Sequence, residues 1–267
     1  MPDESVDYPG LVVPAGHVEP VPRRIRARVG GRWVFDTRRA WYVWEWPGYP
    51  QYAVPLRDLA EGVLLTDDGR TGRLAPGPAR RHSLRIGAEV RAGAAWVWAE
   101  GAPEQLVGTA RFRWDALDAW YEEEEQVFVH PRSPYTRVDA LRSSSSVRVE
   151  VDGVVLADAP SSVKLFETGL PTRYYLERTY VDWTLLRPSD TVTQCPYKGR
   201  TSGYWSFAHG TAVHDDLAWA YDFPTAACSA VAGMVAFYNE RVDLSVDGVA
   251  LPRPTALTRE RWDRLNA

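Results

Sequence analysis

The segment TQCPYKGRTSGYWS, residues 193–206, brings a thiol and an amine together with several aromatic rings. It contains Cys195, one of two cysteines in the chain, and Lys198, one of two lysines. A lysine among aromatic side chains loses hydration, which lowers its pKa and can make it a base or nucleophile, whereas a neighbouring carboxylate raises its pKa. A nearby ammonium also favours the thiolate form of a cysteine. We therefore interpret the segment as one wall of a ligand pocket, with Lys198 as its cation or amine and Cys195 as a weaker nucleophile candidate.

Glu167 is the acid that we expect beside Lys198. It follows the apolar strand residues of LFETG, so it is either a solvent-facing group at a strand end or an acid that faces a pocket. The second interpretation makes Glu167 the acid/base candidate and the partner of Lys198. Arginine would replace Lys198 poorly there, because a guanidinium is larger, planar and always charged.

Aromatic side chains and one arginine in the same half of the chain complete the predicted ligand-binding set. Its members are Tyr174, Tyr197, Tyr204, Trp205, Trp219, Tyr221, Tyr238 and Arg241. Taken singly, the candidate site residues also fit structural roles. A lone cysteine such as Cys195 is often a small buried apolar group, a lysine such as Lys198 is often a surface charge, and an aromatic ring is often part of the core. The histidines show no metal-ligand spacing with cysteines or carboxylates, so the sequence predicts neither a metal site nor a cofactor.

Composition limits the classes of function. A chain of 267 residues that is 45% hydrophobic can bury a large core. The net charge of −4, with both signs scattered, argues against nucleic acid and indicates that the arginine pairs at 23–24, 38–39 and 80–81 are solvated charge. The start of the chain lacks the regions of a secretory signal, and the longest nearly apolar run, residues 226–237, is too short to cross about 30 Å of hydrocarbon. The sequence predicts a cytoplasmic protein with a small-molecule ligand, without nucleic acid or membrane, and leaves its oligomeric state open.

Two halves of the chain resemble each other. IRARVGGRWVFD, from Ile25, aligns with VRVEVDGVVLAD, from Val147, at a spacing of 122 residues (147 − 25 = 122). The register continues from WEWPGYPQYAV to FETGLPTRYYL and pairs Glu45 with Glu167. Each copy predicts a strand, a glycine turn, a second strand and a third strand that ends in the glutamate. A repeat of this length indicates one structural unit per copy.

The later part of the repeat aligns VFVHPR, residues 127–132, with VAFYNE, residues 235–240. That spacing is 108 (235 − 127 = 108) and predicts a net 14 extra residues in the first copy (122 − 108 = 14). VDGVAL, residues 246–251, echoes VDGVVL in the second copy. Residues 66–83, the stretch of copy one that should match the Lys198 segment, lack Cys, Lys, Trp and Tyr. We therefore expect a working site in copy two, with copy one structural or forming a wall of that site.

The fold class is mainly β, with few short helices. The predicted boundaries are an extended N-terminal arm (1–23), a first module (24–142), a second module (143–250) and a helical tail (251–267). DALDAWYEEEEQ, residues 115–126, places Leu117, Trp120 and Tyr121 on one helical face and predicts a packing helix with a solvated glutamate face. TALTRERWDRLNA predicts a helix at the C-terminus.

Several motifs resemble one known family. FETGLPTRYYL, LLRPSDTVTQCPYKGRTSGYW, DLAWAY and VAFYNERVDLSVDG closely resemble the domain-of-unknown-function family 427, with T-x-C-P-Y-K-G as the most specific element. The two copies resemble its tandem members of actinobacterial type. The resemblance covers nearly the whole chain and implies two tandem β-tent-like modules, similar to methionine sulfoxide reductase B and the ligand-binding domain of cereblon. The zinc-holding cysteine pairs and the reductase nucleophile have no match in this sequence, so the resemblance implies neither. A nucleotidyltransferase label attached to the family finds no glycine-rich phosphate loop or paired aspartates here.

Two functions from different classes follow. The first is a small-molecule-binding protein or enzyme that acts on a polar, planar metabolite in an aromatic pocket of the second module. The second is a non-catalytic protein-interaction module. Side chains of the predicted set that gather on one face of the second module would favour the first function, and scattered side chains would favour the second.

Overall fold

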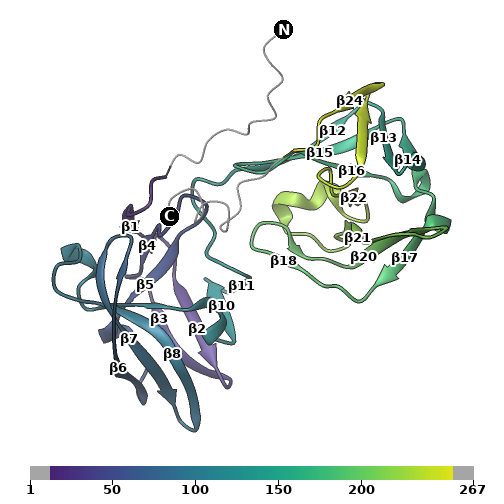
Figure 1. Cartoon of the computed structure of the whole chain (residues 1–267). Coiled ribbons are helices and arrows are strands. Elements are labelled where there is room, and N and C mark those ends of the chain that lie inside the picture. Colours follow the sequence, from purple (N-terminus) through teal and green to yellow (C-terminus); the bar gives the residue numbers. More distant parts are fainter. Residues whose placement is uncertain (1–12, 255–267) are drawn as a thin grey trace. The chain divides into compact units, whose positions relative to one another are not determined.

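The computed structural model describes residues 13–254, and these residues form two compact units. The first unit extends to Ser133 and the second begins at Pro134. Each unit contains one seven-stranded and one four-stranded sheet, and most of their strands are labelled in Figure 1. The helices of the described residues are all short 3-10 turns, so the predicted mainly β class with two tandem modules is confirmed. None of these helices is long and apolar enough to cross a membrane.

The first unit combines two antiparallel sheets. Its seven-stranded sheet has the order β1-β4-β5-β9-β8-β7-β6, from β1 (Val18–Pro20), β4 (Trp41–Val43), β5 (Gln51–Pro55), β6 (Val63–Leu74), β7 (Gly77–Ile86), β8 (Glu89–Trp98) and β9 (Thr109–Phe112). Its four-stranded sheet has the order β11-β10-β2-β3, from β2 (Ile25–Val29), β3 (Arg32–Thr37), β10 (Ala119–Glu122) and β11 (Glu125–Val127). The helical turns are η1 (Leu56–Asp58), η2 (Glu104–Leu106) and η3 (Trp114–Ala116).

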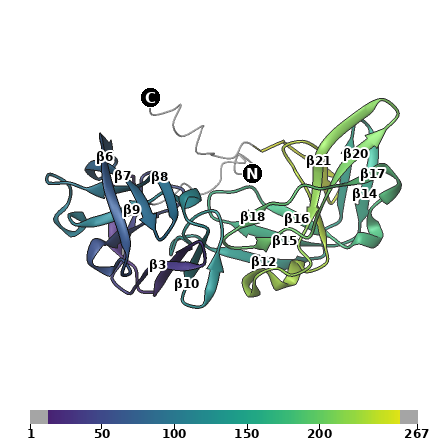
Figure 2. The same cartoon turned by 90° about the horizontal axis from the view of Figure 1, so that it is seen from below.

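The second unit repeats this arrangement. Its seven-stranded sheet has the order β12-β15-β16-β22-β21-β20-β17, from β12 (Val138–Ser143), β15 (Ser162–Glu167), β16 (Arg173–Leu176), β17 (Leu186–Ser189), β20 (Gly203–His209), β21 (Ala212–Ala220) and β22 (Val235–Phe237). Its four-stranded sheet has the order β14-β13-β23-β24, from β13 (Val147–Val151), β14 (Val154–Ala159), β23 (Asp243–Val246) and β24 (Val249–Leu251). The remaining elements are β18 (Gln194–Cys195), β19 (Gly199–Arg200), η4 (Arg178–Tyr180), η5 (Trp183–Leu185) and η6 (Ala226–Val231). Figure 2 shows β17, β20 and β21 of this sheet from a second direction.

The predicted opening hairpins are confirmed in both units. β2 pairs with β3 and β13 pairs with β14, each antiparallel. The turn between β13 and β14 places Asp152 at φ 52° and Gly153 at φ 78°. Two consecutive residues with positive φ give a turn whose twist matches that of the flanking strands, and Asp-Gly is a preferred pair for it. The local sequence therefore determines this turn.

The core of each unit lies between its two sheets. In the second unit, side chains of β13 and β14, such as Val149 and Leu156, pack against Phe207, Leu217 and Phe237 of the larger sheet. In the first unit the cluster between the sheets joins β2 and β3 to β4, β5, β7, β8 and β9. The other face of each seven-stranded sheet carries a second, smaller apolar cluster. Apolar burial on both faces fits the near-continuous apolar runs of the central strands.

The 122-residue spacing holds over the first half of each unit. Phe35 forms an isolated bridge with Leu59, and Ala157 forms the matching bridge with Val181 (35 + 122 = 157; 59 + 122 = 181). Each bridge joins a strand to the residue that follows a 3-10 turn, η1 or η4, and no local sequence pattern predicts such a contact. The repeat is therefore present in the structure as well as in the sequence.

The alignment of VFVHPR with VAFYNE is wrong. Ala53 lies opposite Arg111 in the first unit, and Tyr175 lies opposite Ala236 in the second. The spacing at this point is 125 (236 − 111 = 125), so the second copy has gained three residues (125 − 122 = 3) and the first copy has no 14-residue surplus. VDGVAL belongs to the β23–β24 hairpin, which corresponds to β10–β11. Short alternating apolar segments resemble one another too closely to fix a register without their sheet partners.

The helix expected over residues 115–126 is also absent. The segment forms the turn η3 and then the antiparallel strands β10 and β11, with Glu123 at φ 51° in the turn between them. Trp120 and Glu122 are buried while Tyr121 is only half-buried, which is the period of a strand. Glu122 accepts hydrogen bonds from Arg23 and from Tyr52, so it is not part of a solvated acidic face. The spacing of Leu117, Trp120 and Tyr121 fits a helix only, but pairing of β10 with β2 overrides this local pattern.

Two further expectations concern the chain ends and the arginine pairs. The predicted C-terminal helix, residues 255–267, lies outside the described residues. Within the expected N-terminal arm, Val18–Pro20 forms β1 and pairs with β4. Arg23 and Arg39 each form an ion pair with a carboxylate that is 3% exposed, Glu122 and Asp58 respectively, so these two arginines are not simply solvated charge.

Candidate functional site

The face of the second unit's larger sheet that points away from the core carries the candidate site. Strand pairing places Tyr175 opposite Val163 and Ala236, and Trp219 opposite Ala236 and Tyr204. Directly opposed residues share one face of a sheet. Together with neighbouring residues they form what we call the outer cluster: Val163, Leu165, Tyr175, Tyr204, Trp219, Tyr221, Cys228, Val231 and Ala236.

A buried ion pair joins Glu167 to Lys198 beside this cluster. Glu167 ends β15 two residues after Leu165, so its side chain lies on the same face of the sheet. Lys198 lies in the turn between β18 and β19, and its Nζ donates a hydrogen bond to Glu167 Oε2. The Lys198 side chain is 12% exposed and that of Glu167 is 5% exposed. The predicted pairing of these two residues is confirmed.

The charge state of Lys198 follows from two opposing effects. Burial alone would lower its pKa, but the Glu167 carboxylate, with Cys195 and Tyr175 nearby, outweighs burial and raises the pKa above its usual range. Lys198 is therefore held as an ammonium at neutral pH. This charge state favours a role as a fixed cation and hydrogen-bond donor over a role as a neutral base or nucleophile.

Backbone contacts fix the turn that presents Lys198. The carbonyl of Lys198 accepts a hydrogen bond from the Thr225 amide at 3.1 Å, and the carbonyl of Tyr197 accepts one from the Thr225 hydroxyl. Cys228 Sγ also donates to the Tyr197 carbonyl, at 3.8 Å. Gly199 has a φ of +100°, a conformation that side-chain-bearing residues rarely adopt. Thr225, just before η6, and Cys228 within η6 therefore hold the turn in place.

Tyrosine hydroxyls form a short network at the same face. The Tyr204 hydroxyl lies 2.9 Å from Thr193 Oγ1 and 3.0 Å from the Tyr238 hydroxyl. The Trp219 ring donates from Nε1 to the Tyr175 hydroxyl at 3.2 Å. Burial raises the pKa of Tyr175 to about 12 and also raises the pKa values of Tyr221 and Tyr238. These hydroxyls therefore stay protonated and can act as hydrogen-bond donors.

A second ion pair borders the network. The guanidinium of Arg173 lies 5.6 Å from the ring centroids of both Trp219 and Tyr238. It donates two hydrogen bonds to Glu240, at 2.6 and 2.7 Å. A guanidinium held over aromatic faces by a bidentate carboxylate is a rigid arrangement.

The structure divides the predicted site residues into two groups. It brings Glu167, Cys195, Lys198, Tyr204, Trp219, Tyr221 and Tyr238 together, with Tyr197 next to Lys198 in the same turn. It does not bring Tyr174, Trp205 or Arg241 to them. Tyr174 and Trp205 pack against the core between the sheets, and Arg241 donates to the backbone carbonyls of Asp215 and Asp216.

Tyr175, Arg173 and Cys228 are site neighbours that the sequence argument did not include. The signal was present in the pairing of β15 with β16, because Leu165 lies opposite Arg173 and Val163 lies opposite Tyr175. A correct hairpin register would have selected Tyr175 and rejected Tyr174. Cys228 is fully buried, and burial raises the pKa of its thiol, so it is a poor nucleophile.

The first unit carries the same acid with a different cation. Glu45 corresponds to Glu167 (45 + 122 = 167), and it receives a hydrogen bond at 2.9 Å from Arg111 of β9, the strand beyond β5 in the sheet order. Arg111 corresponds to Ala236, and its cross-strand neighbour Ala53 corresponds to Tyr175. The first unit thus fills this space with an arginine beside an alanine, and the second with a tyrosine beside an alanine. The second unit must then bring its cation from the turn.

The two lysines allow a direct check of the Lys198 environment. An amine-reactive acylating reagent attacks the neutral amine, so burial and a raised pKa both slow the reaction. We expect Lys198 to be acylated about tenfold or more slowly than Lys164 in the folded protein, because one pKa unit changes the neutral fraction tenfold. Peptide mass spectrometry over a time course measures both rates in one sample. Equal rates would contradict the buried, charged state of Lys198.

This chain is similar to known proteins at the level of a protein family. Among residues 13–254, no group of three or more His, Cys, Asp or Glu side chains could hold a metal ion. No curated protein is similar enough to the chain to count as a match. The model of a family described as a domain of unknown function (DUF427) matches the chain twice, over residues 17–123 and 139–248. One match falls in each structural unit, and together they span most of the chain, so this protein belongs to the DUF427 family and carries two of its domains in tandem.

Proposed function

We propose that the second unit binds a small, polar, planar metabolite beside the Lys198–Glu167 ion pair, as a receptor or as an enzyme that acts on it. One observation carries the proposal: the acid that both units share is neutralised from within the sheet in one unit and from a turn in the other. A cation on a turn can exchange its partner with less rearrangement than one on a central strand. The fold itself needs no lysine there, as the Glu45–Arg111 pair demonstrates.

Each group of the site has a chemical role in this proposal. The Lys198 ammonium, held charged by Glu167, donates to an oxygen of the ligand and stabilises negative charge that develops on it. Glu167 positions the ammonium and is the group that could exchange a proton with the ligand. Cys195 is half-buried and close enough to Lys198 to interact with its charge, which keeps it as a nucleophile candidate.

The surrounding side chains support a planar ligand. Tyr197 and Tyr238 are only half-buried, so part of each ring remains accessible beside the buried outer cluster. Aromatic faces bind planar groups by offset stacking, and protonated hydroxyls supply donors at their edges. A carbonyl- or carboxylate-bearing ring is the ligand class that fits both features.

The test is a metabolite screen by thermal shift on the wild type and on Lys198→Arg. We expect a polar, planar compound to raise the melting temperature of the wild type and to leave that of Lys198→Arg unchanged. The guanidinium keeps the charge and the ion pair but not the compact shape of the ammonium, so the fold should stay stable. Lys164→Arg is the matched control and should respond as the wild type does. Undiminished binding by Lys198→Arg would refute the role of Lys198.

A non-catalytic protein-interaction module is the second candidate function. Phe223 favours it, because this large apolar side chain is 90% exposed in the segment that borders the Lys198 turn. An exposed phenylalanine is a common interface anchor. Under this alternative, Phe223→Ser abolishes capture of a protein partner, whereas Lys198→Arg leaves that capture intact.

Three finer expectations belong to the same proposal. They are a β-tent-like arrangement of each unit, a bacterial origin and a cytoplasmic location. The two antiparallel sheets of each unit support the first, the resemblance to tandem members of actinobacterial type supports the second, and the scarcity of cysteine supports the third, since both thiols are free.

A further inference from the structure

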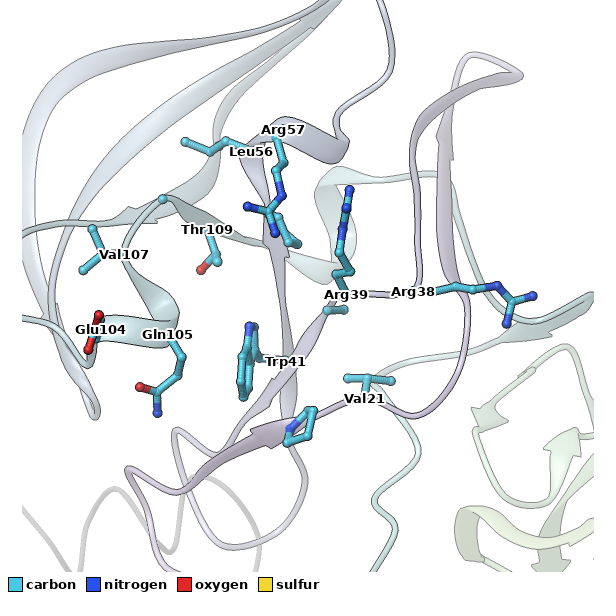
Figure 3. Close-up of a pocket in the computed structure, with 14 residues that line it drawn as sticks. Val21, Arg38, Arg39, Trp41, Leu56, Arg57, Glu104, Gln105, Val107 and Thr109 are labelled. Carbon is cyan, nitrogen blue, oxygen red and sulfur yellow. The ribbon is translucent and has the colours of Figure 1, made fainter.

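A pocket of about 740 Å³ lies in the first unit, where β4 and β9 begin and β5 ends. Figure 3 shows the side chains that line it, with Arg38 directed away from the others. The polar and aromatic members of the lining are Arg38, Arg39, Trp41, Arg57, Gln105 and Thr109, with Glu104 at the edge. The volume suits a small molecule, since ligand sites commonly enclose about 300–1,000 Å³.

The arginines of this pocket differ in what neutralises them. Arg39 donates to Asp58 through Nη2 and, at 3.1 Å, through Nε, so its charge is matched. Thr37 donates to the same carboxylate, whose side chain is 3% exposed. Arg57 is exposed, and no hydrogen bond or ion pair within residues 13–254 involves it. Arg38 points away from the pocket and forms an ion pair with Glu123 at 3.6 Å, and Asp58 is already paired with Arg39, so Arg57 is the guanidinium that is available to a ligand.

The second unit serves as an internal comparison, because its backbone has the same turns at this place. The Leu59 amide donates to the Leu56 carbonyl at 3.3 Å, and the Val181 amide donates to the Arg178 carbonyl at 3.3 Å (56 + 122 = 178). The Val107 amide donates to the Glu104 carbonyl at 3.2 Å. The matching bond in the second unit, 125 residues later, runs from Ala232 to Ser229 at 3.1 Å (104 + 125 = 229).

The side chains at these matched positions are different. Arg38 and Arg39 correspond to Pro160 and Ser161 (39 + 122 = 161). Arg57 corresponds to Thr179 (57 + 122 = 179), and Gln105 corresponds to Ala230 (105 + 125 = 230). The same fold therefore forms without any of these basic or amide groups. Arg38 and Arg39 are paired with Glu123 and Asp58, so Arg57 and Gln105 are the groups whose presence needs a reason other than folding.

We propose that the first unit binds a small organic anion in this pocket, with Arg57 as the main cation and Trp41 as the surface for the ligand's planar part. The anionic group is a phosphate monoester or a carboxylate, both of which match the fork of a guanidinium. This site is separate from the Lys198 site and does not depend on it.

The polarity of the pocket orients such a ligand. The arginines stand near the end of β5, while Glu104 and Gln105 stand on η2, on the opposite side of Trp41 in Figure 3. An anion at Arg57 therefore leaves the far end of the ligand beside a carboxylate and an amide. Hydroxyl or amino donors at that end would find acceptors there.

The experiment is calorimetric titration of the full chain with phenyl phosphate, benzoate and phenol. Phenyl phosphate and benzoate distinguish the two anionic groups, and phenol tests the ring without charge. The variant is Arg57→Thr, which installs the residue of the second unit at an exposed position. Arg85→Thr, at an exposed arginine of β7 outside the pocket, is the control with the same change in net charge.

We expect saturable binding of at least one anion and none of phenol. Affinity should fall about tenfold in Arg57→Thr, the loss of one charge-assisted pair, and stay unchanged in Arg85→Thr. Amide shifts at Gly108 and Thr109 on binding should place the anion in the pocket. Three results would overturn the proposal: no saturable binding by the wild type, equal affinity in Arg57→Thr, or an equal loss in Arg85→Thr. A tetraglutamate peptide that binds more tightly than both anions and shifts the same amides would assign the surface to a protein partner instead.

Discussion

Lys198→Met is expected to destabilise the second unit by about 3–5 kcal/mol, the usual cost of removing one partner of a buried ion pair. The methionine fills a similar volume, but the Glu167 carboxylate, whose side chain is 5% exposed, then has no cation. Most of the loss comes from that uncompensated charge rather than from the lysine's own contacts. The pair therefore makes the turn sensitive to substitution without being a large net source of stability.

Hydrogen exchange of peptides from β15 and β21 measures this loss within the second unit. Lys164→Met is the matched control, because Lys164 is half-buried and donates one bond at 3.3 Å to Ser145. It should cost less than about 1 kcal/mol. The double variant Lys198→Met/Glu167→Leu should recover most of the stability, since an apolar pair of similar volume often replaces a buried ion pair without loss. If Lys198→Met costs no more than Lys164→Met, the pair is screened by solvent and the interpretation of the site is wrong.

Local sequence determined the opening hairpins of both units and the repeat that links them. Alternating apolar residues and glycine turns carry that information within a few residues. The Lys198–Glu167 pair could also be predicted, because a lysine among aromatic residues in an arginine-rich chain needs a partner and the strand-end carboxylate is a natural one. These features depend on short segments or on charge, both of which a sequence displays.

The features that sequence reasoning missed depend on which strands become neighbours. Residues 115–126 fit a helix until Trp120 is paired with Ala27 of β2. The segment that ends in Tyr175 offers two adjacent tyrosines, and the turn between β15 and β16 decides which one shares a face with Glu167. A shift by one residue exchanges the two faces of a strand, so neither local pattern nor composition could make that choice.

The repeat also shows how one fold holds two different sets of polar groups. Glu45 and Glu167 occupy the same place, but the cation comes from β9 in the first unit and from a turn in the second. At the pocket near Arg57 the units also differ, because the first unit has arginines where the second has proline, serine and threonine. Each unit has therefore retained the strands and exchanged the polar groups at a different edge of its sheet.

Alkaline pH is expected to destabilise the protein steeply from about pH 10. Burial raises the pKa of Tyr175 to about 12 from 10.0 and raises those of Tyr221 and Tyr238, while Tyr52 of the first unit is raised in the same direction. The unfolded chain loses these phenolic protons first, so stability is fully present below pH 10 and falls as the pH rises toward the folded pKa values. The raised pKa of Lys198 acts in the same direction, because its favourable charge is lost from the unfolded pKa of 10.5 upward.

Tyr175→Phe isolates one part of this effect. A shift of two pKa units corresponds to a loss on the order of 3 kcal/mol by pH 12, since each unit is worth about 1.4 kcal/mol. At pH 8 the variant should be less stable than the wild type, because Trp219 Nε1 loses its acceptor. Between pH 9 and pH 12, however, its stability should fall less than that of the wild type. Urea unfolding of wild type and variant at each pH gives the two slopes. Parallel slopes would mean that Tyr175 titrates alike in the folded and unfolded chain, and the outer cluster would then be far more open to water than its buried hydroxyls indicate.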